Sequence, residues 1–165
     1  MSEKRDLLRH FLGALAYRTQ KALRAAPPEF ADFEAGNQIR SPKELVRHMT
    51  SVLGYSRTFF IGGSYWPETL ETFSEEIERF HGMLESVSRH LADSDELHGI
   101  SEEQLLQGPF SDAMTHAGQL ALLRRLHGDP VAPENFIVAD ISAEQLSSSQ
   151  AAPASPDKEW PEAPS

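Results

Sequence analysis

The segment that most constrains the fold is 110–128, with the sequence FSDAMTHAGQLALLRRLHG. Its apolar residues recur at steps of three and four, which is the period of an amphipathic helix. Two polar residues, Asp112 and His116, lie on or beside this apolar stripe. They are four apart, so on a helix both side chains project from one face, about one turn from each other. We therefore expect a helix with a polar pair on or beside its apolar face. Its apolar residues are Ala113, Ala117, Leu120, Leu123 and Leu126.

Two side chains at this spacing can share a metal ion. Burying a lone carboxylate is costly even after relaxation, and a divalent cation would remove that cost and give His116 a partner. The simpler interpretation is that Asp112 faces water at the helix end and that His116 is a core histidine with one hydrogen bond. These two residues alone leave both interpretations open.

Three further segments, 3–25, 42–60 and 68–92, also show the helical period. In the last of them the apolar residues alternate steps of three and four, which is the seam typical of helices packed at about 20° in a bundle. No segment alternates polar and apolar residues for long enough to predict a strand. Together with 110–128, these segments predict an all-α four-helix bundle.

Capping motifs mark where helices begin. Ser41 can act as an N-cap, Pro42 suits the first helical position, and Glu44 completes a capping box. The residues 101–104, with the sequence SEEQ, form another capping box. We expect this second box to open one short helical turn, which the Gly-Pro pair at 108–109 then breaks.

The chain divides into a body and a tail. We expect 1–146 to form the bundle domain, because 165 residues suffice for one domain with a substantial core. The segment 129–141 is irregular but keeps several apolar residues, so we expect it to pack back along the bundle. Residues 147–165 are rich in serine, proline and alanine, and we expect a disordered or loosely attached tail.

Charge and composition exclude several functions. The chain has 25 acidic and 15 basic residues and a formal charge of −10, with no basic stripe, so nucleic-acid binding is not expected. No apolar run approaches the length of about eighteen residues that a membrane span needs, and no signal-peptide pattern is present. The absence of cysteine excludes disulfides, thiolate nucleophiles and cysteine-ligated zinc. We expect a cytoplasmic protein that does not span a membrane.

Metal sites in helical bundles are built from inward side chains on facing helices. The sequence offers three such candidates, His48 within the apolar set of the second helix and the pair Asp112 and His116. Two imidazoles and one carboxylate leave coordination positions open for water or substrate, as catalytic sites need and structural sites do not. The other helical histidines fall away from the apolar stripes, and we expect them to face solvent: His10, His81 and His90.

Three stretches, SPKELVRHM, QGPFSDAMTHAGQLALLRRLHGDPV and PENFIVADI, resemble the DinB-like superfamily of bacterial four-helix proteins, which includes the YfiT-like group. The resemblance covers residues 1–141. It implies an up-down-down-up bundle, often a homodimer, with a divalent metal such as zinc or nickel. The superfamily's usual ligands are one histidine on the second helix and two histidines four apart on the fourth. In this chain those positions hold His48, Asp112 and His116.

The chain departs from the superfamily at Asp112, where the usual ligand is histidine. A carboxylate keeps affinity for zinc, nickel, manganese or iron while weakening the preference for metals that favour nitrogen. Because aspartate is shorter than histidine, the metal must lie closer to the last helix, or a water must bridge. The identity of the metal therefore stays open.

Characterised members of the superfamily include metal-dependent transferases of low-molecular-weight thiols and a mycothiol-dependent isomerase. The resemblance thus implies a small-molecule ligand and a thiol cofactor whose pKa falls at the metal. Gln119 lies one turn from His116 and either contacts substrate or serves as an interface amide. Arg124 and Arg125 could meet an acidic cofactor, but cations are favoured at a helix C-terminus, so we expect both on the surface.

Two other functions fit the same residues. One is a non-catalytic, stress-linked binding module, a dimer whose metal site is structural or vestigial; a structural site would need a fourth protein ligand, and the sequence shows no inward candidate. The other is metal-assisted hydrolysis, which needs a general base that the sequence does not identify. For the dimer, we expect Tyr65 and Trp66 to stay partly exposed as a contact patch.

Overall fold

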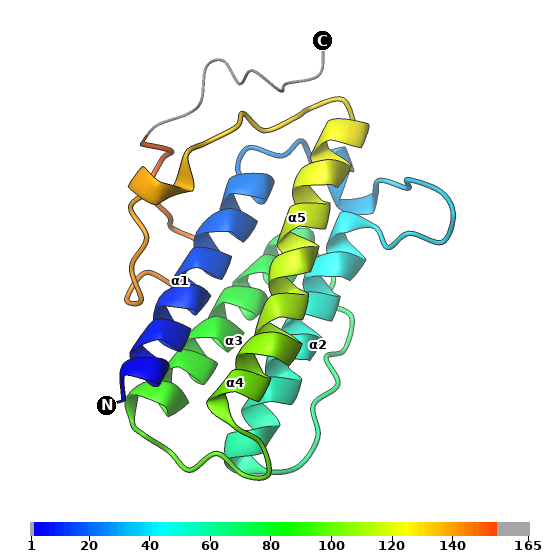
Figure 1. The fold of residues 1–165 in the computed structure, drawn as a ribbon. Coiled ribbons are helices and arrows are strands. Elements are labelled where there is room, and N and C mark those ends of the chain that lie inside the picture. Colours follow the sequence, from blue (N-terminus) through cyan, green and yellow to red (C-terminus); the bar gives the residue numbers. More distant parts are fainter. Residues whose placement is uncertain (1, 155–165) are drawn as a thin grey trace.

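A computed structural model describes residues 2–154, which form the predicted all-α four-helix bundle (Figure 1). Its long helices are α1 (Glu3–Leu23), α2 (Pro42–Ile61), α3 (Phe73–Ala92) and α5 (Ser111–Leu126). Within this part of the chain there is no β-strand. None of the helices formed by these residues combines the length and the apolarity that crossing a bilayer requires.

The four long helices run up, down, down and up in chain order, as the resemblance implies (Figure 1). Helix α1 packs against α3 and α5, and α2 packs against the same two helices, so α1 and α2 lie diagonally opposite each other. Because α2 and α3 run in the same direction, the connection 62–72 must return along the length of the bundle. This connection passes beside the candidate site described below.

The core lies between the four helices. Leucines and aromatics with no exposed surface come from every long helix, and burying each one contributes roughly 1.5–3 kcal/mol. At one end, Phe30 of the short turn η1 (Pro28–Asp32) is also fully buried and closes the core. Representative members of the core are Leu12, Leu15, Met49, Leu53, Phe80, Leu84, Phe110 and Leu120.

Capping explains two helix starts. The Ser41 hydroxyl accepts from the Glu44 N–H, and the Glu44 carboxylate accepts from the Ser41 N–H, so α2 begins where the sequence predicts. Helix α3 begins at Phe73 and not at residue 68, because Thr72 and Glu75 form a capping box that the periodicity does not reveal. Residues 68–72 therefore belong to the connection between α2 and α3.

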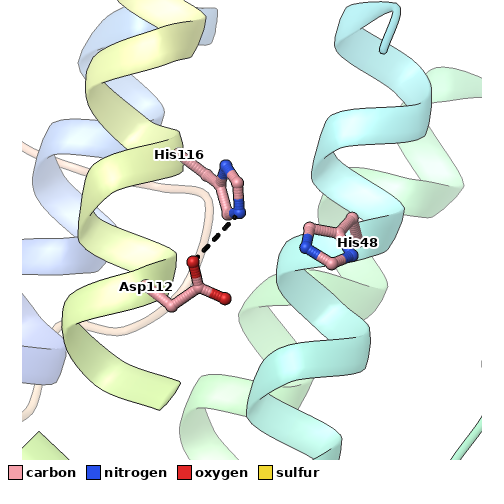
Figure 2. Close-up of side chains that lie close together, drawn as sticks. All are labelled: His48, Asp112 and His116. Atoms are coloured by element: carbon pink, nitrogen blue, oxygen red, sulfur yellow. Dashed lines mark ion pairs between the residues drawn. The ribbon is translucent and has the colours of Figure 1, made fainter. Parts of the chain in front are cut away.

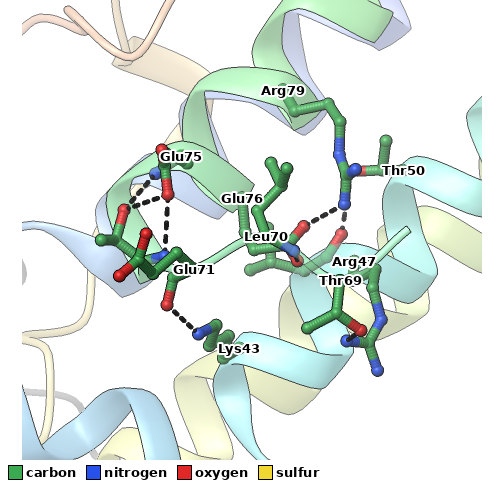
Figure 3. A network of polar contacts seen from close by, with 11 residues as sticks. Lys43, Arg47, Thr50, Thr69, Leu70, Glu71, Glu75, Glu76 and Arg79 are labelled. Carbon is green, nitrogen blue, oxygen red and sulfur yellow. Dashed lines mark hydrogen bonds and ion pairs between the residues drawn. The ribbon is translucent and has the colours of Figure 1, made fainter. Parts of the chain in front are cut away.

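Polar contacts with both helices hold that connection in place (Figure 3). Glu76 of α3 is fully buried, accepts from the Leu70 N–H at 2.9 Å and forms an ion pair with Arg79. Arg47 of α2 donates to the Thr69 hydroxyl at 2.6 Å. These contacts fix residues 69–70 of the connection against the helices on either side.

Gly54 of α2 fixes the earlier part of the connection. A Cβ atom at Gly54 would lie 1.9 Å from Cδ1 of Tyr65, so only glycine lets the tyrosine ring pack so closely against the helix. The next residue, Trp66, projects outward and is 84% exposed. The predicted exposure of Trp66 is confirmed, while Tyr65 is half-buried against α2.

The C-terminal extension covers the face formed by α1 and α3. Leu146 is buried, and its carbonyl oxygen lies 2.6 Å from Nδ1 of His81, a residue that is 1% exposed. The prediction that His81 faces solvent is therefore wrong, because the extension both covers the imidazole and supplies its partner. Gly13 of α1 allows the close approach, since a Cβ there would lie 2.5 Å from the Ser142 carbonyl oxygen.

Residues 147–154, the first part of the expected tail, also contact the bundle. The Ser148 hydroxyl donates to Glu78 at 2.6 Å, and Arg24 donates to the carbonyl oxygens of Gln150 and Ala151 at 2.8 and 2.7 Å. The remainder of the expected tail, 155–165, lies outside the described residues.

Arg124 differs from the prediction of a surface charge, because its side chain is 4% exposed. Its guanidinium donates to the carbonyl oxygens of Ala22 and Arg24 at 2.9 and 3.1 Å and forms an ion pair with Asp129. The last carbonyls of a helix lack partners within the helix, and Arg124 satisfies those at the end of α1. Arg125 is exposed, as predicted.

Candidate metal centre

Asp112 and His116 on α5 face His48 on α2 across the space between the two helices (Figure 2). One ligand atom of each residue, two imidazole nitrogens and a carboxylate oxygen, lies within 4.8 Å of the others. His116 Nε2 is 3.3 Å from Asp112 Oδ1, and the centroids of the two imidazole rings are 4.8 Å apart. The fold thus brings together all three residues that the sequence predicts as metal ligands, in an arrangement that could hold a metal ion.

The three side chains differ in their access to water. His116 lies on the buried face of α5 beside Ala113 and Ala117, and its side chain is 11% exposed. The Asp112 side chain is 50% exposed and lies in the first turn of α5, where the helix dipole also favours a carboxylate. His48 is half-buried. Because water reaches Asp112, the cost of burying its charge is small, and the case for a cation rests on geometry.

Gln119 orients His116. Its amide oxygen Oε1 lies 2.7 Å from His116 Nδ1, so Nδ1 carries the proton and donates it. The other ring nitrogen, Nε2, then faces the Asp112 carboxylate oxygen, 3.3 Å away. Either a proton on Nε2, which makes this contact an ion pair, or a cation can lie between the two atoms. Gln119, predicted as a substrate contact or an interface amide, therefore acts on His116, in the way that outer partners orient metal-ligating histidines.

The environment of His48 keeps its imidazole neutral. Burial, and secondly the positive charge of Arg40, hold the pKa of His48 below its ordinary value of 6.5. The nearby His116 acts in the same direction, and the Asp112 carboxylate acts against them. A neutral imidazole keeps a lone pair available, which a metal ligand requires.

The donor set fits a divalent transition metal. Two ligands bound tetrahedrally to one zinc ion are about 3.4 Å apart, which matches the separation of His116 Nε2 and Asp112 Oδ1, 3.3 Å. The widest separation in the group, up to 4.8 Å, exceeds the roughly 4.2 Å that two ligands of one ion can span, so a small side-chain rotation must close it. Two imidazoles and a carboxylate suit zinc, nickel, iron or manganese.

Two pockets open beside two of these ligands, one at His48 and one at Asp112. The pocket beside His48 has a volume of about 220 Å³ and is lined by Arg40, Arg47 and Trp66, among others. The pocket beside Asp112 has a volume of about 660 Å³. Ser51 of α2 lines both. A small molecule can therefore reach His48 from one pocket and Asp112 from the other.

The larger pocket is bounded by a widened helical turn, η2 (Leu106–Phe110), between the short helix α4 (Glu102–Leu105) and α5. The break that the sequence predicts at Gly108 and Pro109 is confirmed as a kink, because Gly108 has non-helical backbone angles, φ −94° and ψ −105°. The Ser111 hydroxyl donates to the Leu106 carbonyl at 2.6 Å and so satisfies an acceptor that the kink frees. Widened turns of this kind are frequent at functional sites.

Three residues beside the site, Arg40, Arg47 and Trp66, are not predicted from the sequence. A signal for Arg47 is present, because positions 44, 47 and 51 recur at steps of three and four around His48 on α2, whereas Arg40 precedes the start of this helix at Pro42. Trp66 has no such signal, since its position depends on the path of the connection between α2 and α3.

Comparison with known proteins leaves the family of this chain unassigned. No family model, no curated protein and no solved structure matches it. The DinB-like resemblance therefore depends on the quoted stretches of sequence, and the activity that it implies is a proposal.

Proposed function

We propose that this chain is a DinB-like protein that binds a divalent metal through His48, Asp112 and His116. The observation that carries the proposal is the convergence of the three ligand atoms within 4.8 Å between α2 and α5. The contact between Gln119 and His116 supports it, because this contact turns Nε2 of the ring towards the carboxylate. Zinc or nickel is the ion that we expect, and iron and manganese suit the same ligands.

We further propose that the protein is a transferase that uses a low-molecular-weight thiol. A divalent ion at this site would supply Lewis acidity, which lowers the pKa of a thiol. The chain's own residues contribute position: Gln119 holds the His116 ring, and the two pockets, one beside His48 and one beside Asp112, give room for two reactants. A transfer reaction needs space for two reactants.

Hydrolysis is less well supported by the residues around the site. It requires a general base beside the attacking water. The residues lining the two pockets include one carboxylate besides Asp112, that of Glu44, and its Oε2 already accepts from the Ser41 N–H at 2.9 Å. A closed structural site is also less well supported, because the Asp112 side chain is 50% exposed. The lack of an available general base and the exposure of Asp112 both favour the transferase over the two other functions.

The metal site is tested by elemental analysis of the untagged protein after incubation with zinc, nickel, manganese or iron. The parent is compared with His48→Ala and Asp112→Ala, and with His10→Ala as a control that removes an exposed histidine from α1. We expect near-stoichiometric metal in the parent and the control and its loss from the other two variants. A parent without metal, or equal metal in all four proteins, would overturn the proposal.

The homodimer and the cytoplasmic location are part of the same proposal. The dimer follows from the resemblance to the DinB-like superfamily, in which homodimers are common. Light scattering at micromolar protein concentration tests it, and a monomer at that concentration would remove the dimer from the proposal.

A further inference from the structure

The pocket beside His48 differs in charge from the rest of the molecule. The whole chain carries a formal charge of −10, yet this pocket is lined by Arg40, Arg47 and a single carboxylate, that of Glu44. Across residues 2–154, neither arginine has a carboxylate oxygen within 4.0 Å. An acidic protein thus keeps two arginines without ion-pair partners next to a candidate metal ligand.

The charges in this pocket are only partly compensated. The Glu44 carboxylate accepts from the Ser41 N–H in the capping box of α2, which fixes it at the start of the helix. Arg47 uses one N–H to bind the Thr69 hydroxyl, and its planar guanidinium has further donors. Arg40 is exposed. Two cations and one anion leave the pocket with a net positive charge even before a metal binds.

Trp66 forms another wall of the same pocket, together with Pro67. Its indole is 84% exposed although the adjacent Tyr65 is held against Gly54, so the position of the tryptophan is set by an anchored segment. A flat aromatic surface beside guanidinium groups is a combination that recognises anions joined to a planar or apolar body. The pocket beside Asp112 has no arginine or lysine among its lining residues.

We propose that the pocket of Arg40, Arg47 and Trp66 binds the anionic end of a small-molecule substrate. A carboxylate or phosphate group of the substrate accepts hydrogen bonds from the two guanidinium groups, and the adjoining part of the molecule lies against Trp66. The other end of the same molecule then reaches the ligand group at His48. This inference rests on the proposed function and gives its small molecule a charge and an orientation.

The first test measures anion binding without metal. In a Trp160→Phe background Trp66 is the single tryptophan, because the chain has two. Metal-free protein is titrated with inorganic phosphate and with succinate while its fluorescence is recorded. We expect a saturable change, weakened about tenfold by Arg47→Gln and about threefold by Arg40→Gln, since Arg40 is more exposed. The tighter of the two anions identifies the class of the substrate's charged group.

Two controls accompany this titration. Thr69→Val removes the hydrogen bond of Arg47 but keeps its charge, so it separates loss of the guanidinium from disturbance of the connection. Arg89→Gln removes an exposed positive charge in the last turn of α3, at the opposite end of the bundle. Both should bind like the parent. The absence of a saturable change, or equal weakening by Arg40→Gln, Arg47→Gln and Arg89→Gln, would overturn the proposal.

The second test links the anion to the metal centre. Cobalt-loaded protein is titrated with glutathione and with its diethyl ester, which lacks the two negative charges, and thiol binding is followed by absorption. We expect the parent to prefer glutathione by about tenfold and Arg47→Gln to lose that preference. Equal affinity for both thiols in the parent would show that the pocket of Arg40, Arg47 and Trp66 does not recognise the charge of a thiol bound at the metal. Failure to bind cobalt would refute the metal site, while the fluorescence titration would still decide the anion pocket.

Discussion

His81 and His116 both lie on long helices and are both nearly inaccessible, at 1% and 9% exposure, but they have opposite surroundings. The His81 ring is held on both sides, with Nδ1 2.6 Å from the Leu146 carbonyl oxygen and Nε2 3.2 Å from the Gln20 side chain. The His116 ring is held on one side by Gln119, and its other nitrogen faces Asp112 and His48. A buried histidine whose two nitrogens both contact protein oxygens stabilises the fold. A histidine with one nitrogen facing other potential ligands could instead coordinate a metal ion.

The two histidines represent two faces of the bundle. The C-terminal extension covers the face of α1 and α3, where Tyr17 donates to Glu134 at 2.5 Å and Arg9 pairs with Glu144 at 2.6 Å. The face of α2 and α5 carries the three candidate ligands and the two pockets. Changes on the first face should therefore alter stability, and changes on the second should alter ligand binding.

The largest effect is expected from His116→Ala, which should lower metal affinity by more than about a hundredfold because it removes a ligand, a greater loss than removing an outer partner causes. The free energy of unfolding of the metal-free protein should change by only about 1 kcal/mol, since the ring has one intact hydrogen bond to lose. Competition with a chelator measures the affinity, and urea unfolding measures the stability. Unchanged affinity would contradict the division between the two faces.

His81→Leu should have the converse effect. It leaves the buried Leu146 carbonyl without its donor, so we expect a loss of about 2 kcal/mol in the free energy of unfolding, with metal affinity unchanged. His10→Leu, the same substitution at an exposed position of α1, serves as the control and should be close to neutral. A fall in metal affinity in His81→Leu would show that the two faces are coupled.

Gln119→Leu tests how the face of α2 and α5 positions a candidate ligand. Without the acceptor at Nδ1 the His116 ring loses its orientation, so metal affinity should fall about tenfold, less than on removing the ligand itself. Gln119→Glu keeps an acceptor oxygen and should retain the affinity of the parent. Metal titration of the two variants measures the difference, and equal losses in both would argue that Gln119 does not act through His116.

The smallest effect is a dependence of stability on pH. Burial holds the pKa of His81 below its ordinary value of 6.5, so the unfolded chain takes up a proton that the folded chain resists. The metal-free protein should therefore lose stability as the pH falls from 6.5 towards the lower pKa of the folded state, by at most about 1.4 kcal/mol per pH unit. Urea unfolding between pH 7.5 and about pH 5.5 measures this loss. In His81→Leu the free energy of unfolding should depend less steeply on pH. A dependence as steep as in the parent would show that His81 does not cause it.

The four helices and the three candidate ligands could be predicted because they depend on short-range patterns. The period of three and four residues sets the helix faces, and His48, Asp112 and His116 occupy positions on those faces that the pattern directs towards a neighbouring helix. The capping box at Ser41 and Glu44 likewise needs only four consecutive residues.

The residues that the sequence does not place correctly depend on distant partners. His81 contacts Leu146, 65 positions away, and Arg124 contacts Ala22, 102 positions away. No periodicity within α3 or α5 can report such partners, so an off-stripe histidine and a terminal arginine look exposed. The same reason hides Trp66, because the pocket that it lines exists only once the connection has returned along the bundle.

The parallel course of α2 and α3 has a consequence for how such a protein can diversify. The ligands lie on two rigid helices, whereas Trp66 and Pro67 belong to a return segment anchored by Gly54 at its beginning and Glu76 beyond its end. A stretch of chain between fixed anchors can be exchanged without disturbing the helices. Residues 66–68 could thus be replaced, and the wall of the pocket beside His48 altered, while the three candidate ligands keep their positions.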